Sequence, residues 1–272
     1  MSGQPARLVI CPTPIGNLED VTLRVLSALR EADVIACEDT RRTRVLLDRY
    51  GVSAPTVSYH EHNERERAAE LVKRMQAGET VALVSDAGMP LVSDPGFVLV
   101  QAAVAAGIGV EVLPGPSAVL TALVASGLPA ASWRFVGFLP RKRGELERLF
   151  REGRETLVAF ESPKRVGAAL AALAAVDPDR QAAVCRELTK VHEEVVRGTA
   201  AELAERYAAE EPRGEIVLVV GPGDEERADF DRALQALERL VETGAKPRPA
   251  ASVISELTGV SANDLYRALT ER

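Results

Sequence analysis

Short apolar runs alternate with longer segments of helical spacing through the first half of the chain. The apolar runs are Leu8–Cys11, Val34–Cys37, Val81–Val84 and Val110–Leu113. This alternation predicts an α/β fold, in which the strands pair in a parallel sheet and helices cover both of its faces. Ligands bind beyond the carboxyl ends of such strands, so the loops that follow the runs are where we look for chemistry.

The segments between these runs have the spacing of amphipathic or buried helices. The predicted helices are Val21–Ala32, Arg42–Tyr50, Asn63–Ala77, Gly96–Ala106 and Ser117–Ser126.

The pattern changes after the small and turn-forming residues 127–133. Strand patterns follow at Arg134–Leu139, Leu157–Glu161, Gln181–Glu187, Glu193–Gly198 and Glu215–Val220. Several of them succeed one another without a helix, which predicts a mixed sheet. We therefore expect an N-terminal α/β domain over residues 1–130 and a C-terminal α/β domain over residues 131–224.

Residues 225–272 are predicted to form a helical C-terminal extension. Glu225–Glu242 has the pattern of an amphipathic helix, and Lys246–Pro249 predicts a stiff link to two short helices, Ala250–Thr258 and Ser261–Thr270. The pair resembles a helix-turn-helix in outline. A helical pair packed on its own domain accounts for the pattern equally well.

Composition narrows the class of protein. The apolar runs are far shorter than the roughly 20 residues that cross a bilayer, and no secretion signal is visible, so we expect a cytoplasmic protein. Cys11, Cys37 and Cys185 lie in or at the end of apolar runs, which predicts core thiols and no disulfide framework. His60 and His62 lack further residues at ligand spacing, so no metal site is expected. The net charge of -7 argues against non-specific coating of nucleic acid.

The segment Ser85–Gly96, S-D-A-G-M-P-L-V-S-D-P-G, predicts a ligand loop. Its two Ser-Asp pairs can cap turns, its glycines let a ligand approach the backbone, and its prolines stiffen the path. Asp94 and Pro95 also predict the start of the next helix, with Asp94 as the cap and Pro95 at the first helical position.

Three other loops follow strands of the first half. Pro12–Leu18 can present backbone amides, but the fingerprints of dinucleotide and NTP sites are missing, which disfavours both ligands. Glu38–Arg44 places two carboxylates beside three guanidiniums, which suits phosphate, although a helix start with a solvated basic face is an ordinary alternative. Pro114–Ala118 begins a helix whose free amides would face the same crevice.

Charged loops also occur in the second half. Gly137–Arg143 sets an aromatic ring beside three cations, a combination that suits single-stranded nucleic acid. Glu161–Arg165 and Arg186–Lys190 add mixed charge at strand ends, and each could equally be a salt-bridged surface.

Six motifs, taken in order from about Leu8 to Gly221, closely resemble the bacterial ribosomal RNA small-subunit methyltransferase I family. They are T-P-I-G-N-L, E-D-T-R, S-D-A-G-x-P-x-x-S-D-P-G, P-G-P-S-A, G-F-L-P-R-K and R-E-L-T-K-x-x-E-E. That family belongs to the tetrapyrrole methylase superfamily, whose members have two α/β domains and bind S-adenosyl-L-methionine in the cleft between them.

The resemblance implies 2'-O-methylation of a cytidine ribose in the decoding centre of 16S ribosomal RNA, on free RNA or on the small ribosomal subunit, by a homodimer. Two alternatives stay open. One is a precorrin-type C-methyltransferase that acts on a tetrapyrrole, and the other is an RNA-binding module without catalysis.

The resemblance also implies which residues contact the cofactor. They are Pro14, Gly16, Asp86, Ala87, Gly88, Ser93, Asp94, Pro95, Ser117 and Ala118. Two residues depart from the family pattern. Met89 stands where Thr is usual, and Lys164 takes the place of the His in E-S-P-H-R, the more usual form of E-S-P-K-R.

Methyl transfer to a ribose hydroxyl needs a group that accepts the proton, and it needs neither a metal nor a covalent intermediate. The candidates for proton acceptor are Glu38, Asp39 and Glu161, with Arg186 or Lys190 stabilising the developing alkoxide. Contacts to the RNA backbone are assigned to Arg41, Arg42, Arg141, Lys142 and Arg143.

Overall fold

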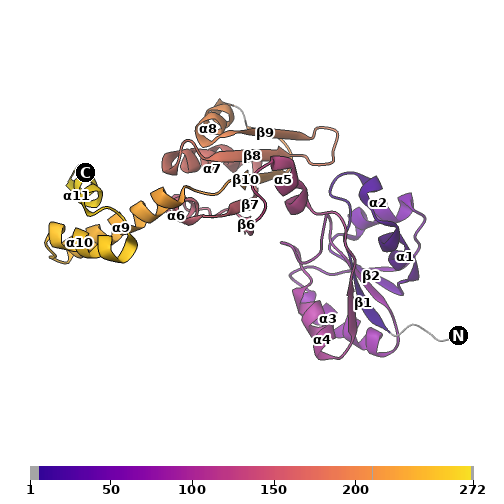
Figure 1. Ribbon diagram of the computed structural model, residues 1–272. Coiled ribbons are helices and arrows are strands. Elements are labelled where there is room, and N and C mark those ends of the chain that lie inside the picture. The colour runs from indigo at the N-terminus through magenta and orange to yellow at the C-terminus, as the bar shows by residue number, and fades with distance from the viewer. Residues whose placement is uncertain (1–5, 210, 271–272) are drawn as a thin grey trace. The chain divides into compact units, whose positions relative to one another are not determined.

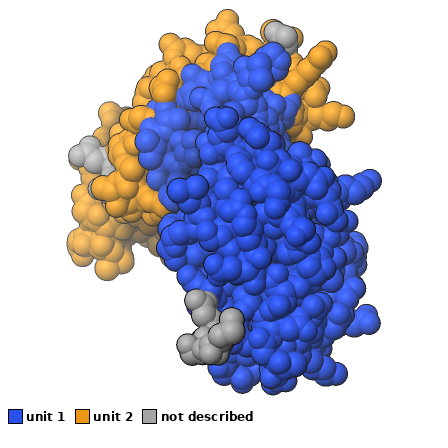
Figure 2. Space-filling view, turned by 90° about the vertical axis from the view of Figure 1, so that its right-hand side faces the viewer, with its two compact units in different colours: residues 1–126, 184–195, 214–217 blue, residues 127–183, 196–213, 218–272 orange. Residues whose placement is uncertain are grey.

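The computed structural model describes residues 6–209 and 211–270, with the side chains of residues 225–228 outside the description. The chain divides into two compact units, which Figure 2 shows in different colours. The first unit comprises residues 1–126, 184–195 and 214–217, and the second comprises residues 127–183, 196–213 and 218–272. The three domains expected from the sequence, with boundaries at 130 and 224, stay a prediction.

A parallel sheet forms the centre of the first unit (Figure 1). Its strand order is β3-β2-β4-β1-β5, and every pair from β3 to β5 runs parallel. The strands are β1 (Arg7–Cys11), β2 (Val34–Cys37), β3 (Thr56–Ser58), β4 (Val81–Val84) and β5 (Gly109–Val112). The prediction of a parallel sheet is confirmed, and only β3 was not predicted.

Helices cover both faces of this sheet, as predicted. Two separate hydrophobic clusters lie on its two sides, one packed under α1 (Leu23–Glu31) and α2 (Thr40–Arg49), the other under α3 (Glu64–Gln76) and α4 (Phe97–Ala105). Because β2, β4 and residues 8–11 of β1 are buried on both faces, their side chains are apolar without alternation.

The three cysteines are buried free thiols, which confirms the prediction of core residues. Burial raises the pKa of Cys11 to about 12, with the charge of Glu111 adding to the effect. Burial likewise raises the pKa of Cys37, so both of these thiols are protonated at neutral pH. Among the described residues, no group of three or more His, Cys, Asp or Glu side chains could hold a metal ion.

The prediction that Asp94 and Pro95 open the next helix is wrong. Helix α4 begins at Phe97, and its N-cap is Gly96 with φ 143°. A Cβ at Gly96 would lie 2.8 Å from Leu91 Cδ1 and 2.9 Å from Leu83 Cδ2. The backbone thus passes so close to the core that only glycine fits, and the helix starts after this approach.

The second sheet has the strand order β6-β7-β10-β8-β9. Its strands are β6 (Trp133–Phe138), β7 (Thr156–Glu161), β8 (Gln181–Arg186), β9 (Glu194–Thr199) and β10 (Ile216–Val220). Strands β6 and β7 pair in parallel, whereas the loop 187–193 between the neighbours β8 and β9 is too short for a parallel crossover (Figure 1). The sheet is therefore mixed, as expected.

Helix α5 (Ala118–Ser126) ends the first stretch of the first unit. The helices between the strands of the second sheet are α6 (Arg143–Glu152), α7 (Pro163–Val176) and α8 (Ala200–Ala209). Helix α7 packs against both α6 and α8. The guanidinium of Arg180 is buried in the second unit and donates hydrogen bonds to the carbonyls of Phe150, Gly153 and Gly221. These three bonds tie the ends of several elements together.

The C-terminal helices α9 (Glu225–Glu242), α10 (Pro247–Thr258) and α11 (Ala262–Thr270) pack around a hydrophobic cluster of their own. The predicted stiff link over Lys246–Pro249 is wrong, because Pro247 and Pro249 lie in the first turn of α10. Proline is tolerated there, since the first amides of a helix have no partner within the helix. Gly259, with φ 77°, ends α10 in the left-handed conformation.

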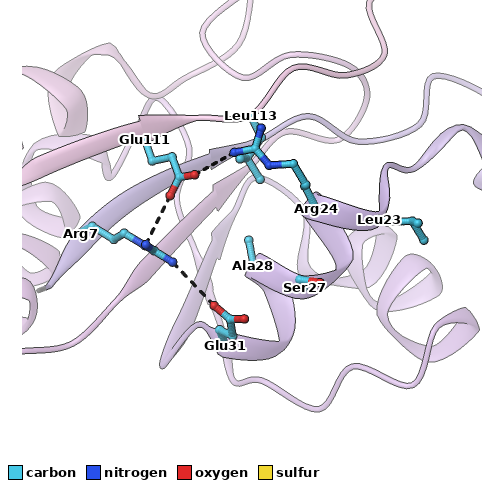
Figure 3. Close-up of a pocket in the computed structure, with 8 residues that line it drawn as sticks. All are labelled: Arg7, Leu23, Arg24, Ser27, Ala28, Glu31, Glu111 and Leu113. Atoms are coloured by element: carbon cyan, nitrogen blue, oxygen red, sulfur yellow. Dashed lines mark hydrogen bonds and ion pairs between the residues drawn. The ribbon is translucent and has the colours of Figure 1, made fainter. Parts of the chain in front are cut away.

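A surface pocket of about 260 Å³ lies beside α1 and the edge strand β5 (Figure 3). A chain of ion pairs crosses it, in which Arg7 contacts Glu31 at 3.6 Å and Glu111 at 3.5 Å, and Arg24 contacts Glu111 at 3.0 Å. None of the residues assigned to a site from the sequence lines this pocket. Glu111 lies on the edge strand β5, and charged side chains on an edge strand disfavour its pairing with another chain.

No helix in the described part of the chain is long and apolar enough to cross a membrane.

Candidate active site

The loops after β1 and β4 are joined at the carboxyl edge of the first sheet. Thr13 and Gly88 exchange two backbone hydrogen bonds of 2.9 Å. The buried hydroxyl of Thr13 donates to the carbonyl of Ser85, and the hydroxyl of Ser85 donates to the carbonyl of Gly88, both at 3.0 Å. The structure therefore brings the first loop and the S-D-A-G segment together, as the position of both loops after parallel strands predicts.

Asp86 connects the S-D-A-G segment to the E-D-T-R loop after β2. Its Oδ1 accepts a hydrogen bond of 3.0 Å from the amide of Asp39, and its Oδ2 lies 3.4 Å from the Arg42 guanidinium. Asp86 was assigned to the cofactor from the sequence, and the structure shows that it also holds the beginning of α2 in place.

Asp39 caps helix α2. Its carboxylate accepts hydrogen bonds from the amide of Arg41 at 2.8 Å and from the Arg41 side chain at 3.1 and 2.8 Å. The Arg41 hydrogen bonds hold the pKa of Asp39 at about 2. A carboxylate with so low a pKa is a weak base, so the structure disfavours Asp39 as proton acceptor.

The pKa values of two other carboxyl groups at this edge are raised rather than lowered. Burial, and then the charge of Glu38, raise the pKa of Asp94 to about 6. Burial and the charge of Asp86 likewise raise the pKa of Glu38. The loops after β2 and β4 thus concentrate carboxyl groups that are costly to ionise together, a feature that is frequent in functional sites.

Strained backbone marks the same loops. The four described non-glycine residues with positive φ are Leu91 (73°), Ser93 (64°), Glu187 (49°) and Thr189 (65°). Two of them lie in the S-D-A-G-M-P-L-V-S-D-P-G segment and two in R-E-L-T-K. Such strain persists only where surrounding contacts enforce it, and it is concentrated at active sites and ligand clamps.

The remaining predicted cofactor contacts fall at the same edge. Pro14 and Gly16 lie in the loop after β1, and Ser117 lies before α5, where its hydroxyl accepts a hydrogen bond of 3.4 Å from Leu120 N. Ala118 is the first residue of α5. Gly16, Ala87 and Ser93 are exposed, so a ligand can reach them. Met89, the departure from the family pattern, packs on the hydrophobic cluster under α3 and α4.

Arg186 and Lys190 are counted with the first unit, and both are ion-paired. Arg186 contacts Glu194 at 3.2 Å, while Lys190 contacts Glu187 at 2.8 Å and Glu215 at 3.1 Å. Burial lowers the pKa of Lys190, but its hydrogen bonds to Glu187 and Glu215 outweigh burial and raise it. Glu187 and Glu215 were not assigned from the sequence, and the only signal was the mixed charge of the motif.

The other predicted site residues belong to the second unit. Glu161 has a buried side chain that accepts a hydrogen bond of 2.6 Å from Ser162 N and lies 3.4 Å from Arg165, and burial raises its pKa. Arg141, Lys142 and Arg143 are exposed, with Lys142 paired to Glu145 and Arg143 paired to Glu147 on α6. Their participation in one site with the first unit stays a prediction.

Comparison with known proteins identifies the family. The profile of the Tetrapyrrole (Corrin/Porphyrin) Methylases matches residues 7–204. A protein of Mesorhizobium japonicum called ribosomal RNA small subunit methyltransferase I is 50% identical over 98% of this chain and 92% of its own length. A protein of the same name from Thermotoga maritima is 44% identical over 79% of this chain and 97% of its own length.

The fold also matches solved structures. Uroporphyrin III C-methyl transferase from Thermus thermophilus, determined in complex with S-adenosyl homocysteine, superposes with a TM-score of 0.56 at 23% identity, over 79% of this chain and 97% of that chain. At this identity the match supports the fold alone. The profile and the identity to curated relatives together show that this chain belongs to the tetrapyrrole methylases and, among them, to the ribosomal RNA small subunit methyltransferase I family.

Proposed function

We propose that this chain is an S-adenosyl-L-methionine-dependent methyltransferase that modifies the 2'-hydroxyl of a cytidine in the decoding centre of 16S ribosomal RNA. The observation that carries the proposal is identity of 50% to a ribosomal RNA small subunit methyltransferase I along nearly the whole chain. The joined loops at the carboxyl edge of the first sheet support it, because all of them belong to the motifs of that family.

The chemistry of these loops fits the cofactor. S-adenosyl-L-methionine carries a sulfonium and an ammonium group, and Glu38, Asp86 and Asp94 offer carboxylates at the edge where the loops meet. The left-handed turns at Gly88, Leu91 and Ser93 expose backbone groups for hydrogen bonds. We assign the cofactor to the loops that hold Pro14, Gly16, Asp86–Gly88, Ser93–Pro95 and Ser117–Ala118.

When bound, the cofactor supplies an electrophilic methyl group, and the chain must position the ribose hydroxyl and receive its proton. We propose Glu38 as the proton acceptor, because its raised pKa makes it a better base than Asp39. Glu161 is the second choice, since its carboxylate is buried and already hydrogen-bonded. An unchanged rate of methyl transfer in Glu38→Gln would exclude Glu38.

We propose that the RNA backbone contacts Arg41, Arg42, Arg141, Lys142 and Arg143. The side chains of Arg41 and Arg42 are 88% and 68% exposed although each pairs with an aspartate, so phosphate oxygens can still reach them. Replacing one of these cations with Gln should weaken RNA binding and reduce the salt dependence of log K by about one. A salt dependence equal to that of the unmodified protein would remove that residue from the interface.

The decisive experiment measures methyl transfer from labelled S-adenosyl-L-methionine to small ribosomal subunits that lack this modification. Mapping and digesting the labelled nucleotide distinguishes ribose from base methylation, and we expect label on a cytidine ribose. Cofactor binding without transfer to subunits or naked RNA would favour a tetrapyrrole substrate. RNA binding that is indifferent to the cofactor would favour a non-catalytic module.

We further propose a homodimer that acts on ribosomal subunits in the cytoplasm. Helices α4 and α5 are apolar around nearly their whole circumference, yet Phe97, Val104, Leu120 and Val124 are exposed. Helices of this composition are normally buried, so a second copy is expected to cover them. Analytical ultracentrifugation should give a dimer that Val124→Glu weakens, and a monomeric unmodified protein would contradict the proposal. Cosedimentation with ribosomal subunits from the cytoplasmic fraction tests the location.

A further inference from the structure

The loop between β8 and β9 is built on Glu187. Its Oε1 accepts hydrogen bonds of 2.8 Å from both Lys190 Nζ and Glu215 N. The backbones of the same three residues are joined as well, with Glu187 N donating to Glu215 O and Lys190 N donating to Glu187 O, each at 3.0 Å. One carboxylate therefore fixes both a cation and a neighbouring chain segment.

This arrangement requires strained and tightly packed backbone. Glu187 and Thr189 hold left-handed φ values of 49° and 65°, and Thr189 is β-branched. A Cβ at Gly214 would lie 2.4 Å from Glu187 Cγ and Cδ, so the side chain of Glu187 rests directly on glycine backbone. Strain of this kind is destabilising and persists only where surrounding contacts enforce it, and the bonds of Glu187 supply such contacts.

The same loop packs closely against the loop after β1, which contains Gly16. A Cβ at Gly16 would lie 2.4 Å from Lys190 Cγ, 2.7 Å from Thr189 Oγ1 and 2.9 Å from Leu188 O. The aliphatic stem of Lys190 thus faces Gly16, while its ammonium group is turned toward Glu187 and Glu215. In the described part of the chain, the buried hydroxyl of Thr189 has no hydrogen-bond partner.

We propose that Glu187 is a positioning residue of the cofactor site, which acts by holding Lys190 against the backbone of Gly16. The inference rests on the proposed function, because Gly16 is assigned to the cofactor there. Glu187 carries more of this task than Glu215, since the exposed fraction of its side chain is 19% against 74% for Glu215. Exposed ion pairs contribute little, and shielded hydrogen-bonded ones contribute more.

The test compares the binding of S-adenosylhomocysteine by calorimetry in three single variants, a double variant and a control variant. Glu187→Gln keeps the shape of the side chain but removes its charge, and we expect Kd to rise about tenfold, as for the loss of one charge-assisted hydrogen bond. Glu215→Gln should raise Kd only about twofold to threefold. Lys190→Met keeps an aliphatic side chain but removes the ammonium group that pairs with Glu187 and Glu215, so its Kd should rise about as much as that of Glu187→Gln.

The double variant Glu187→Gln/Lys190→Met shows whether Glu187 acts through Lys190. Its Kd should equal that of Lys190→Met alone, because residues that act as one unit are not additive. Glu31→Gln is the matched control, since Glu31 pairs with Arg7 in the separate pocket of Figure 3, and its Kd should equal that of the unmodified protein. Thermal unfolding shows that each variant is folded.

Two outcomes overturn the inference. One is a folded Glu187→Gln that binds as tightly as the unmodified protein, and the other is a double variant in which the two losses add. Should Glu187→Gln not fold, Lys190→Met decides, because unchanged affinity there removes the link from Lys190 to Gly16. If the unmodified protein does not bind S-adenosylhomocysteine at all, the proposed function fails instead.

Discussion

At the scale of single residues, Asp94 combines a cost in stability with a proposed role in binding. Its pKa is raised to about 6, above the usual 3.8, so the folded state binds this proton more tightly than the unfolded chain. The stabilisation from the protonated form is complete below the unfolded pKa and is lost as the pH rises through about 6. Asp94→Asn should therefore unfold at a higher temperature than the unmodified protein near pH 7.5, and at a similar temperature near pH 4.

The same residue predicts a pH dependence of binding. Protonation of Asp94 removes a negative charge from the site, so S-adenosyl-L-methionine, with its sulfonium charge, should bind less tightly at about pH 5.5 than at about pH 7.5. S-adenosylhomocysteine lacks that charge and is the control ligand. We expect a smaller pH effect for it and for Asp94→Asn, measured by calorimetry. Equal pH effects for both ligands would mean that Asp94 does not face the sulfonium.

At the scale of helices and strands, buried parallel strands were the easiest to predict. Strands β2 and β4 coincide with their predicted apolar runs, because a strand that is buried on both faces is apolar at every position. Strand β3, with the sequence T-V-S, is short and half-buried, so its composition does not differ from that of a loop. Two helix starts were predicted wrongly from proline and aspartate. Asp94-Pro95 precedes a close backbone approach at Gly96, so α4 begins only at Phe97. Pro247 is the first residue of α10 and not part of a link before it.

The contacts inside the site could be predicted only in part. Because loops after parallel strands meet at one edge, the sequence places Thr13, Asp39 and Asp86 near one another. It does not show that Asp86 bonds Asp39 N, or that Lys190 pairs with Glu215. Those partners are far apart in the sequence, and which of many carboxylates meets which donor depends on loop backbone that has no periodic pattern.

At the scale of the whole molecule, the chain carries a helical extension with its own core. The cluster of α9, α10 and α11 includes Leu234, Leu237, Ile254 and Leu265, and it shares no residue with the clusters of the first unit. The family profile ends at residue 204, before these helices begin. The residues of the first unit that surround the cofactor loops therefore lie outside the extension.

This separation predicts the effect of removing the extension. A chain that ends at Asp224 should bind S-adenosylhomocysteine within about threefold of the full chain, a difference below 1 kcal/mol. Its unfolding temperature should fall only slightly, because the ion pair between Arg154 and Asp229 that is lost with the extension is partly exposed. Calorimetry and thermal unfolding of the two chains provide the comparison.

A folded, shortened chain that binds the ligand more than tenfold more weakly would show that the extension supports the cofactor site. Intact cofactor binding with loss of methyl transfer to ribosomal subunits would instead assign the extension to RNA, because only the substrate would then distinguish the two chains.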